Sequence, residues 1–224
     1  MTSGRDEPVL VVHGLGRTPA SMAVLTTRLR KAGHDVLSFG YPSRSEPMES
    51  LVDRLGSSVE RRAPGATTSI HFVTHSMGGV LVRSYLGARP ARHAGRVVML
   101  SPPNRGSEIV DAFAESAMLR RLLGPAGARL GTGPNSIPNR LGPVDFELGV
   151  ITGSRSIDPI GSWLIPGPDD GKVSVERARV DGAADFLVVP ATHTFIMNRS
   201  DVAHHVAHFL RHGHFDRSGT GTHE

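Results

Sequence analysis

The sequence predicts an α/β fold in which a mostly parallel sheet of about six strands carries helices on both faces. Short apolar runs alternate with helix-like segments, and strands that are apolar throughout are typical of a sheet covered on both sides. The apolar runs lie at residues 9–12, 70–73, 80–82, 97–100 and 186–189. A chain of 224 residues is long enough for one sizeable core. We therefore expect a single domain over residues 8–212, with flexible polar tails at 1–7 and 216–224.

The first predicted strand, residues 8–12, leads into a glycine-rich turn, and a helix is expected near residues 18–31. Because Gly14 and Gly16 flank Leu15, another molecule can come close to the main chain there. The backbone N–H of Leu15 can then face a negatively charged oxygen, as in an oxyanion hole. A plain strand-to-helix turn is the alternative for these residues.

A second strand-to-helix turn places a serine hydroxyl at a strand end. Residues 69–75 form a strand-like run that ends at Ser76, and a helix-like segment follows. Such a turn exposes the hydroxyl above a helix N-terminus and needs small residues close by, which Gly78 and Gly79 supply. We predict Ser76 as a nucleophile and the N–H of Met77 as the second oxyanion donor. An ordinary turn that contains glycine is the alternative.

A general base is expected on a loop after a late strand, from which it can reach the serine. Residues 184–190 are predicted as that strand, and a helix is expected over residues 198–212. His193 lies between them, and we predict it as the base. His75 adjoins the serine but is expected to point elsewhere along its strand, and His13 is expected to brace its turn.

A carboxylate that orients the histidine should follow the preceding strand, predicted at residues 144–152. The segment after it offers Asp158, Asp169, Asp170 and Glu176. We favour Asp170 because the glycine that follows it relieves the turn, whereas Asp158 precedes a proline and can simply start a turn. Asp169 and Asp158 remain alternatives.

Several segments together resemble a known superfamily. They are His13-Gly14-Leu15, Thr74-His75-Ser76-Met77-Gly78-Gly79, Asp170-Gly171-Lys172-Val173 and His193. The order of Ser76, Asp170 and His193 along the chain is that of nucleophile, acid and base in α/β-hydrolases, and the resemblance covers about residues 8–210. Thr74 departs from the glycine of the usual G-x-S-x-G pattern, which leaves the subfamily open.

Within that superfamily the chain looks most like small bacterial serine esterases and lipases, to which residues 101–107 are also similar. The resemblance implies hydrolysis of a small carboxylic ester through an acyl-enzyme, with no cofactor. Separately, the apolar side chains near residues 109–113 favour short to medium acyl chains. A triacylglycerol lipase, a thioesterase or an amidase of the same fold is the alternative. A binding protein that keeps the fold without catalysis is a further one.

About forty residues separate the strands expected near residues 97–101 and 144–152, which is more than a plain connection needs. We call residues 104–143 the cap segment. Ile109, Val110 and Phe113 lie on one helical stripe and are predicted to line an apolar acyl pocket. The cap segment can be a mobile lid or a helix packed permanently on the core, and residues 124–143 are expected to be loop.

Three histidines near the C-terminus, His204, His208 and His212, have the i, i+4 spacing that can bind a metal ion. They lie opposite the apolar stripe of the predicted helix over residues 198–212, so a solvated helix face is expected and no metal site is predicted.

The net charge of +4 comes from basic residues that are scattered along the chain, which argues against a nucleic-acid partner. No apolar stretch is long enough for stable membrane insertion, and the first residues lack the apolar core of a signal peptide. We expect a soluble cytoplasmic protein, although a signal peptide that has been removed would leave no trace. The oligomeric state stays open.

Overall fold

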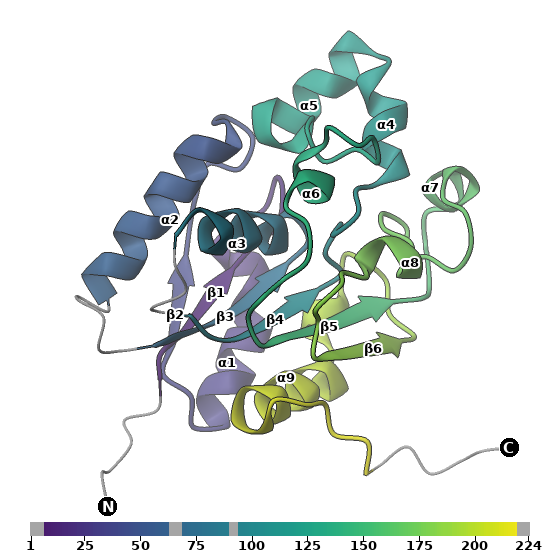
Figure 1. The fold of residues 1–224 in the computed structure, drawn as a ribbon. Helices are drawn as coiled ribbons and strands as arrows, with labels where there is room; N and C mark the ends of the chain where they lie inside the picture. Colours follow the sequence, from purple (N-terminus) through teal and green to yellow (C-terminus); the bar gives the residue numbers. More distant parts are fainter. Residues whose placement is uncertain (1–6, 63–68, 90–93, 219–224) are drawn as a thin grey trace, which may run out of the picture.

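The computed structural model describes residues 7–62, 69–89 and 94–218, and Figure 1 shows their fold. Six strands in this part of the chain form one parallel sheet in the order β2-β1-β3-β4-β5-β6. The strands are β1 (Val9–Val12), β2 (Val36–Phe39), β3 (Ile70–His75), β4 (Ala94–Leu100), β5 (Leu148–Gly153) and β6 (Asp185–Val189). The predicted fold class is confirmed.

Helices cover both faces of the sheet (Figure 1). One face carries α2 (Met48–Arg62) and α3 (Met77–Ala88), and the other carries α1 (Ala23–Lys31) and α9 (Ser200–His212). Because side chains alternate along a strand, Leu10 and Val12 of β1 pack toward α2 and α3, whereas Val9 and Val11 pack toward α1 and α9. All four side chains are buried, which explains why the strand is apolar throughout.

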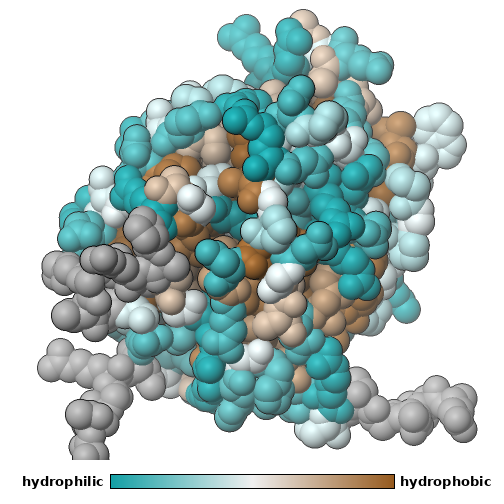
Figure 2. Space-filling model, in the orientation of Figure 1, coloured by the Kyte–Doolittle hydropathy of each residue, from teal (hydrophilic) through white to brown (hydrophobic). Residues whose placement is uncertain are grey.

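The remaining helices of the described residues are short and lie around the carboxyl ends of the strands or in connections. They are η1 (Pro19–Met22), α4 (Glu108–Ala114), α5 (Ala117–Gly127), α6 (Ile137–Arg140), α7 (Pro159–Leu164), α8 (Val175–Ala178) and η2 (Ile196–Asn198). Hydrophilic side chains cover most of the face seen in Figure 2, with hydrophobic residues visible in patches between them. None of the helices in the described ranges has the length and apolar character that a membrane span requires.

The cap segment contains three helices, so the prediction of a loop over residues 124–143 is wrong in two places. The helical stretch α5 continues to Gly127, and α6 forms at residues 137–140. Gly124 takes a φ of 67° in the middle of α5, which kinks the chain and lets Pro125 start a new turn. The helical stripe predicted for Ile109, Val110 and Phe113 lies on α4, and α5 follows it as a separate helix.

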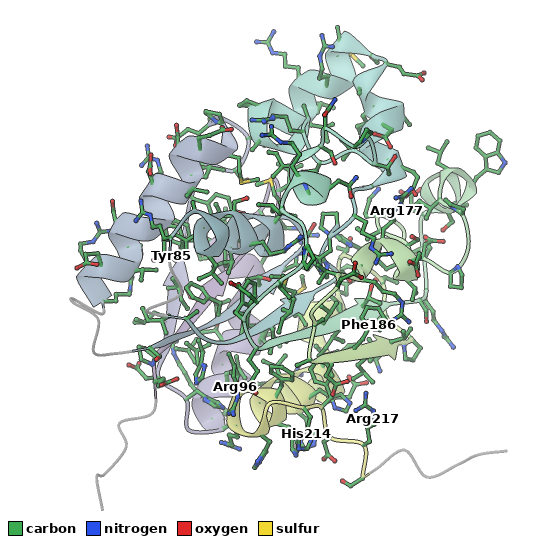
Figure 3. The ribbon with its side chains drawn as sticks, viewed as in Figure 1. Tyr85, Arg96, Arg177, Phe186, His214 and Arg217 are labelled. Carbon is green, nitrogen blue, oxygen red and sulfur yellow. The ribbon has the colours of Figure 1, made fainter. Side chains whose placement is uncertain are left out.

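Two further boundaries differ from the predictions. β5 begins at Leu148 because the N–H of Val144 bonds to the carbonyl of Asp181 outside the sheet. The expected C-terminal tail is tied down at its start, since Arg217 pairs with Asp185 of β6 at 2.6 Å (Figure 3). The expected tails at residues 1–6 and 219–224 lie outside the described residues.

The strand order creates a topological switch point between β1 and β3. The chain passes from β1 outward to β2 and then returns to the opposite side of β1 as β3. The connections that follow β1 and β3 therefore leave toward opposite faces, one into α1 and the other into α3. In open α/β sheets such a switch point at the carboxyl ends of the strands is where ligands bind.

The close approach of α3 to β1 predicts a contrast between two glycines of the same helix. A Cβ on Gly78 would lie 2.6 Å from the carbonyl oxygen of His13, whereas a Cβ on Gly87 would have no described neighbour within 4 Å. Gly78→Ala should lower the free energy of unfolding by about 1–3 kcal/mol because backbone must move. Gly87→Ala should leave it unchanged or raise it by up to about 1 kcal/mol. Urea unfolding of both variants measures the difference, and equal midpoints would contradict the tight packing.

Candidate active site

Ser76 lies at the junction of β3 and α3 in a strained backbone conformation, with φ 53° and ψ −126°. Few residues other than glycine adopt a positive φ, so the surrounding structure must hold this turn in place. The N–H of Ser76 donates to the carbonyl of Leu100 at 2.9 Å. Gly14 permits the close approach of the neighbouring loop, since a Cβ there would lie 3.0 Å from the Cβ of Ser76.

Thr74, the departure from the usual serine-turn pattern, is fully buried beneath this junction. A Cβ on Gly79 would lie 3.2 Å from the Thr74 hydroxyl oxygen and 3.0 Å from the sulfur of Met99. The absent side chain of Gly79 therefore leaves the room that the larger Thr74 occupies. The two residues compensate each other, which explains how the turn tolerates a β-branched side chain.

Ser76, His193 and Asp170 form a continuous chain of hydrogen bonds. The Ser76 hydroxyl donates to Nε2 of His193 at 3.0 Å, and Nδ1–H of His193 donates to Oδ2 of Asp170 at 2.8 Å. The backbone N–H of His193 also donates to the carbonyl of Asp170 at 2.9 Å. In this assignment the imidazole is neutral with its proton on Nδ1, which leaves Nε2 free to accept a proton from Ser76.

The Asp170 side chain is completely enclosed, and its second oxygen is also used. Oδ1 accepts from the backbone N–H groups of Lys172 and Val173 at 3.0 and 2.9 Å. Burial by itself would raise the pKa of Asp170, but electrostatic attraction to the His193 ring and the hydrogen bonds to both oxygens hold the pKa below its ordinary value. The carboxylate is therefore ionised at neutral pH.

The two alternative acids contact other groups. Asp169 accepts from the Ser162 hydroxyl at 2.8 Å and from the N–H of Gly171 at 2.7 Å, which shapes the loop. Asp158 caps α7 and pairs with Lys172 at 2.7 Å. Of the acids that the sequence offered, the described contacts bring Asp170 to His193.

His75 and His13 brace the site from two sides. His13 stacks on Tyr41 at 4.3 Å between ring centroids, and it fits the expected bracing role. His75 does not point elsewhere along its strand as predicted: its Nε2–H donates to the carbonyl of His193 at 3.0 Å. Its Nδ1 is buried without a hydrogen-bond partner among the described residues. The sequence offered no signal for this contact, because the two residues are 118 positions apart.

A cavity of about 250 Å³ opens next to Ser76 and His193. Leu15 and Met77 also line it, and the structure records no hydrogen bond from either backbone N–H to a described residue. Apolar side chains of the cap segment form another part of the wall. They are Ile109, Val110, Phe113, Leu123 and Leu130. The structure thus brings the predicted oxyanion donors and the three predicted pocket residues to one cavity.

The described residues contain no group of three or more His, Cys, Asp or Glu side chains placed to hold a metal ion. His204 and His212 are exposed on α9, opposite its buried apolar face, and His204 pairs with Asp216 at 2.8 Å. The rings of His208 and His212 are 4.4 Å apart. This arrangement agrees with the expected solvated face of the helix.

No protein-family model matches this sequence, and no curated protein matches it. Solved structures do resemble it. The mature lipase BlEst2 of Bacillus licheniformis matches with a TM-score of 0.72 at 20% identity, covering 88% of this chain and 89% of that one. A metagenomic carboxyl esterase, MGS0156, matches with a TM-score of 0.65 at 18% identity, covering 86% of this chain and 66% of that one.

Phospholipase PlaB of Legionella pneumophila matches with a TM-score of 0.65 at 18% identity, covering 79% of this chain and 45% of the phospholipase. At such low identities the likeness establishes architecture. The chain has an α/β-hydrolase-like fold, and its structural neighbours include bacterial lipases and esterases, as the sequence resemblance indicated.

The burial of His75 predicts a pH dependence of stability. Burial lowers the pKa of His75 well below 6.5, and the adjacent ring of His193 adds repulsion whenever both rings carry a proton. Below pH 6.5 the unfolded chain therefore takes up a proton at His75 that the folded protein does not. Stability falls as the pH drops, by up to about 1.4 kcal/mol per pH unit from this one group.

His75→Gln should flatten that slope between pH 6.5 and 5, as measured by urea unfolding at several pH values. A comparison at pH 8, where neither protein gains the proton, isolates the loss of packing and of the hydrogen bond to His193. An unchanged slope would mean that His75 is protonated in the folded protein.

Proposed function

We propose that this protein is a serine hydrolase that cleaves carboxylic esters through an acyl-enzyme intermediate. The observation that carries this proposal is the hydrogen-bonded chain from Ser76 through His193 to Asp170 at the edge of a cavity. The α/β-hydrolase-like fold and the esterases among its structural neighbours support the same conclusion. The nucleophile is Ser76, the base is His193 and the orienting acid is Asp170.

In the first step the Ser76 oxygen attacks the ester carbonyl while Nε2 of His193 takes the hydroxyl proton. Asp170, which holds Nδ1–H, stabilises the imidazolium as it forms. The N–H groups of Leu15 and Met77 donate to the oxyanion of the tetrahedral intermediate. His193 then gives the proton to the leaving alcohol, and water repeats the sequence on the acyl-enzyme, which releases the acid and restores Ser76.

The apolar part of the cavity wall favours an acyl chain of short to medium length. Phe113 and its apolar neighbours in the cap segment give the chain a hydrophobic place, and the cavity volume of about 250 Å³ limits its size. The ester group of the substrate reacts at the polar side of the cavity, where Ser76 and His193 lie.

The cap segment is tied to its surroundings, which favours a fixed cap and an esterase. Arg177 of α8 donates to Glu108 of α4 at 2.7 Å, and in Figure 3 it lies between α8 and the cap helices. The Ser107 hydroxyl donates to the carbonyl of Lys172 at 2.7 Å. A lipase remains the second candidate, because Met118 is 72% exposed on α5 and could contact lipid. Thioesterase or amidase chemistry would use the same residues.

Ser76→Ala should leave the fold intact and lower hydrolysis of short nitrophenyl esters by roughly 10³-fold or more, because no acyl-enzyme can form. Rates across a series of acyl chain lengths measure this effect and also the acyl preference. Intact-mass measurement after fluorophosphonate treatment should show one adduct on the wild-type protein and none on the variant. A folded Ser76→Ala protein that keeps its turnover would exclude the mechanism, and a wild-type protein without label or turnover would favour a binding function.

Asp170→Asn and Asp169→Asn form a matched pair of adjacent, buried carboxylates. Asp170→Asn should reduce kcat by about 10³–10⁴-fold, since an amide cannot hold the needed tautomer of His193 or balance its charge. Asp169→Asn should act mainly on stability through its contacts with Ser162 and Gly171. Ester hydrolysis and urea unfolding of both variants separate the two effects. The reverse order of activities would transfer the acid role to Asp169.

A further inference from the structure

The cavity next to Ser76 has an uneven distribution of charge. Two cationic side chains, Arg17 and Lys172, line it, and no aspartate or glutamate among the described residues does. The carboxylate of Asp170 lies behind His193, where its side chain is enclosed and both of its oxygens already accept hydrogen bonds. The described lining of the cavity therefore carries positive charge and no carboxylate.

Lys172 contributes little net charge to the cavity, because the carboxylate of Asp158 neutralises it. Its Nζ donates to Oδ2 of Asp158 at 2.7 Å, and Oδ1 of Asp158 accepts from the N–H of Gly161 at 2.9 Å. The pair is close to neutral as seen from the cavity. The excess positive charge of the cavity thus comes from Arg17.

Arg17 has no such partner. It is partly buried, and its side chain forms no ion pair and no hydrogen bond with any residue that the structure describes. Other arginines of this protein, such as Arg54, Arg129 and Arg217, each pair with a carboxylate at 2.6 Å. A guanidinium that is partly removed from water and left unpaired is unfavourable, so it is the kind of group that a ligand anion stabilises.

The position of Arg17 places its charge beside the reaction. Arg17 follows the predicted oxyanion donor Leu15 by two residues, at the end of the turn that the carbonyl of Gly14 closes with the Arg17 N–H at 3.3 Å. Its charge also reaches the buried His75 below the nucleophile. The apolar acyl wall belongs to the cap segment instead, so the cavity has one wall for a hydrocarbon chain and one cation for an anion.

We propose that Arg17 binds an anionic group, a carboxylate or a phosphate, of the ester substrate and so determines its specificity. This inference rests on the proposed ester hydrolysis and adds the substrate class: esters that carry a negative charge near the scissile bond. The guanidinium supplies a planar pair of N–H donors, which suits either anion. The anion belongs either to the alcohol or to the far end of the acyl chain, and the experiment has one arm for each.

The test compares kcat/KM for two matched pairs of esters. The alcohol arm uses 4-carboxyphenyl butyrate against its neutral methyl ester, and the acyl arm uses 4-nitrophenyl hemiglutarate against 4-nitrophenyl hexanoate. In one arm Arg17→Gln should reduce kcat/KM for the anionic ester by about 10-fold or more, mainly through KM, and leave the neutral ester nearly unchanged. Arg61→Gln, an exposed change of equal charge on α2, is the control and should change neither.

Equal losses for neutral and anionic esters would overturn the proposal, because Arg17 would then act on the transition state of every ester. Unchanged ratios in both arms would overturn it as well, while ester hydrolysis itself would stand.

A binding measurement keeps the two proposals separable. Calorimetric titration of Ser76→Ala with each ester requires no turnover, and the added Arg17→Gln change should weaken binding of the anionic ester by about 10-fold. Wild-type protein that cleaves no ester but binds the anionic one through Arg17 would refute the hydrolase and keep the anion site. If the affinity depends neither on the charge of the ester nor on the Arg17→Gln change, the anion site is refuted.

Discussion

The strained backbone of Ser76 is the constraint on which the rest of the site depends. A φ of 53° at a non-glycine residue persists only when close packing leaves no alternative, and here glycines make that packing possible. Gly14 brings the β1 turn against Ser76, and Gly78 brings α3 against the carbonyls of β1. The same contacts lie at the switch point between β1 and β3 and place at one cavity the N–H groups of Leu15 and Met77, for which the described part of the chain offers no hydrogen-bond partner. The backbone strain of Ser76, the close packing around it and the geometry of the candidate site therefore depend on the same contacts.

The cap segment is connected to the same helix that follows Ser76. Arg83 of α3 is buried, and its guanidinium donates to Asn104 and to the carbonyl of Gly142, near the two ends of the cap segment. Burial lowers the pKa of Arg83 to about 10, so the group stays charged at neutral pH and holds neutral carbonyls by charge-assisted hydrogen bonds. These bonds connect both ends of the cap segment, which supplies the apolar wall of the cavity, to the helix that begins after the candidate nucleophile.

Some parts of the structure lay beyond local sequence patterns. The kink at Gly124 and the short α6 depend on how the cap segment packs. Judged from the sequence alone, without the residues that pack against them, glycine and proline indicate a loop. The contact between His75 and His193 joins two segments that are distant along the chain, and no periodicity predicts it. The sequence also does not show that Arg17 lacks an acidic partner among the residues that the structure describes, because acidic and basic residues are nearly balanced and their pairing depends on the fold.

The sequence by itself determined the parallel sheet covered on both faces, because apolar runs and glycine turns act through local geometry and through burial that any fold of this pattern requires. It also indicated Ser76 as a candidate nucleophile and His193 as a candidate base, because strand ends and the turns after them can be predicted from neighbouring residues. Only the tertiary structure decided between Asp170 and its neighbour Asp169, which differ in the partner that each side chain reaches. That choice depends on how two loops meet across the edge of the sheet, and the direction of a side chain in a loop follows from long-range packing rather than from the residues beside it.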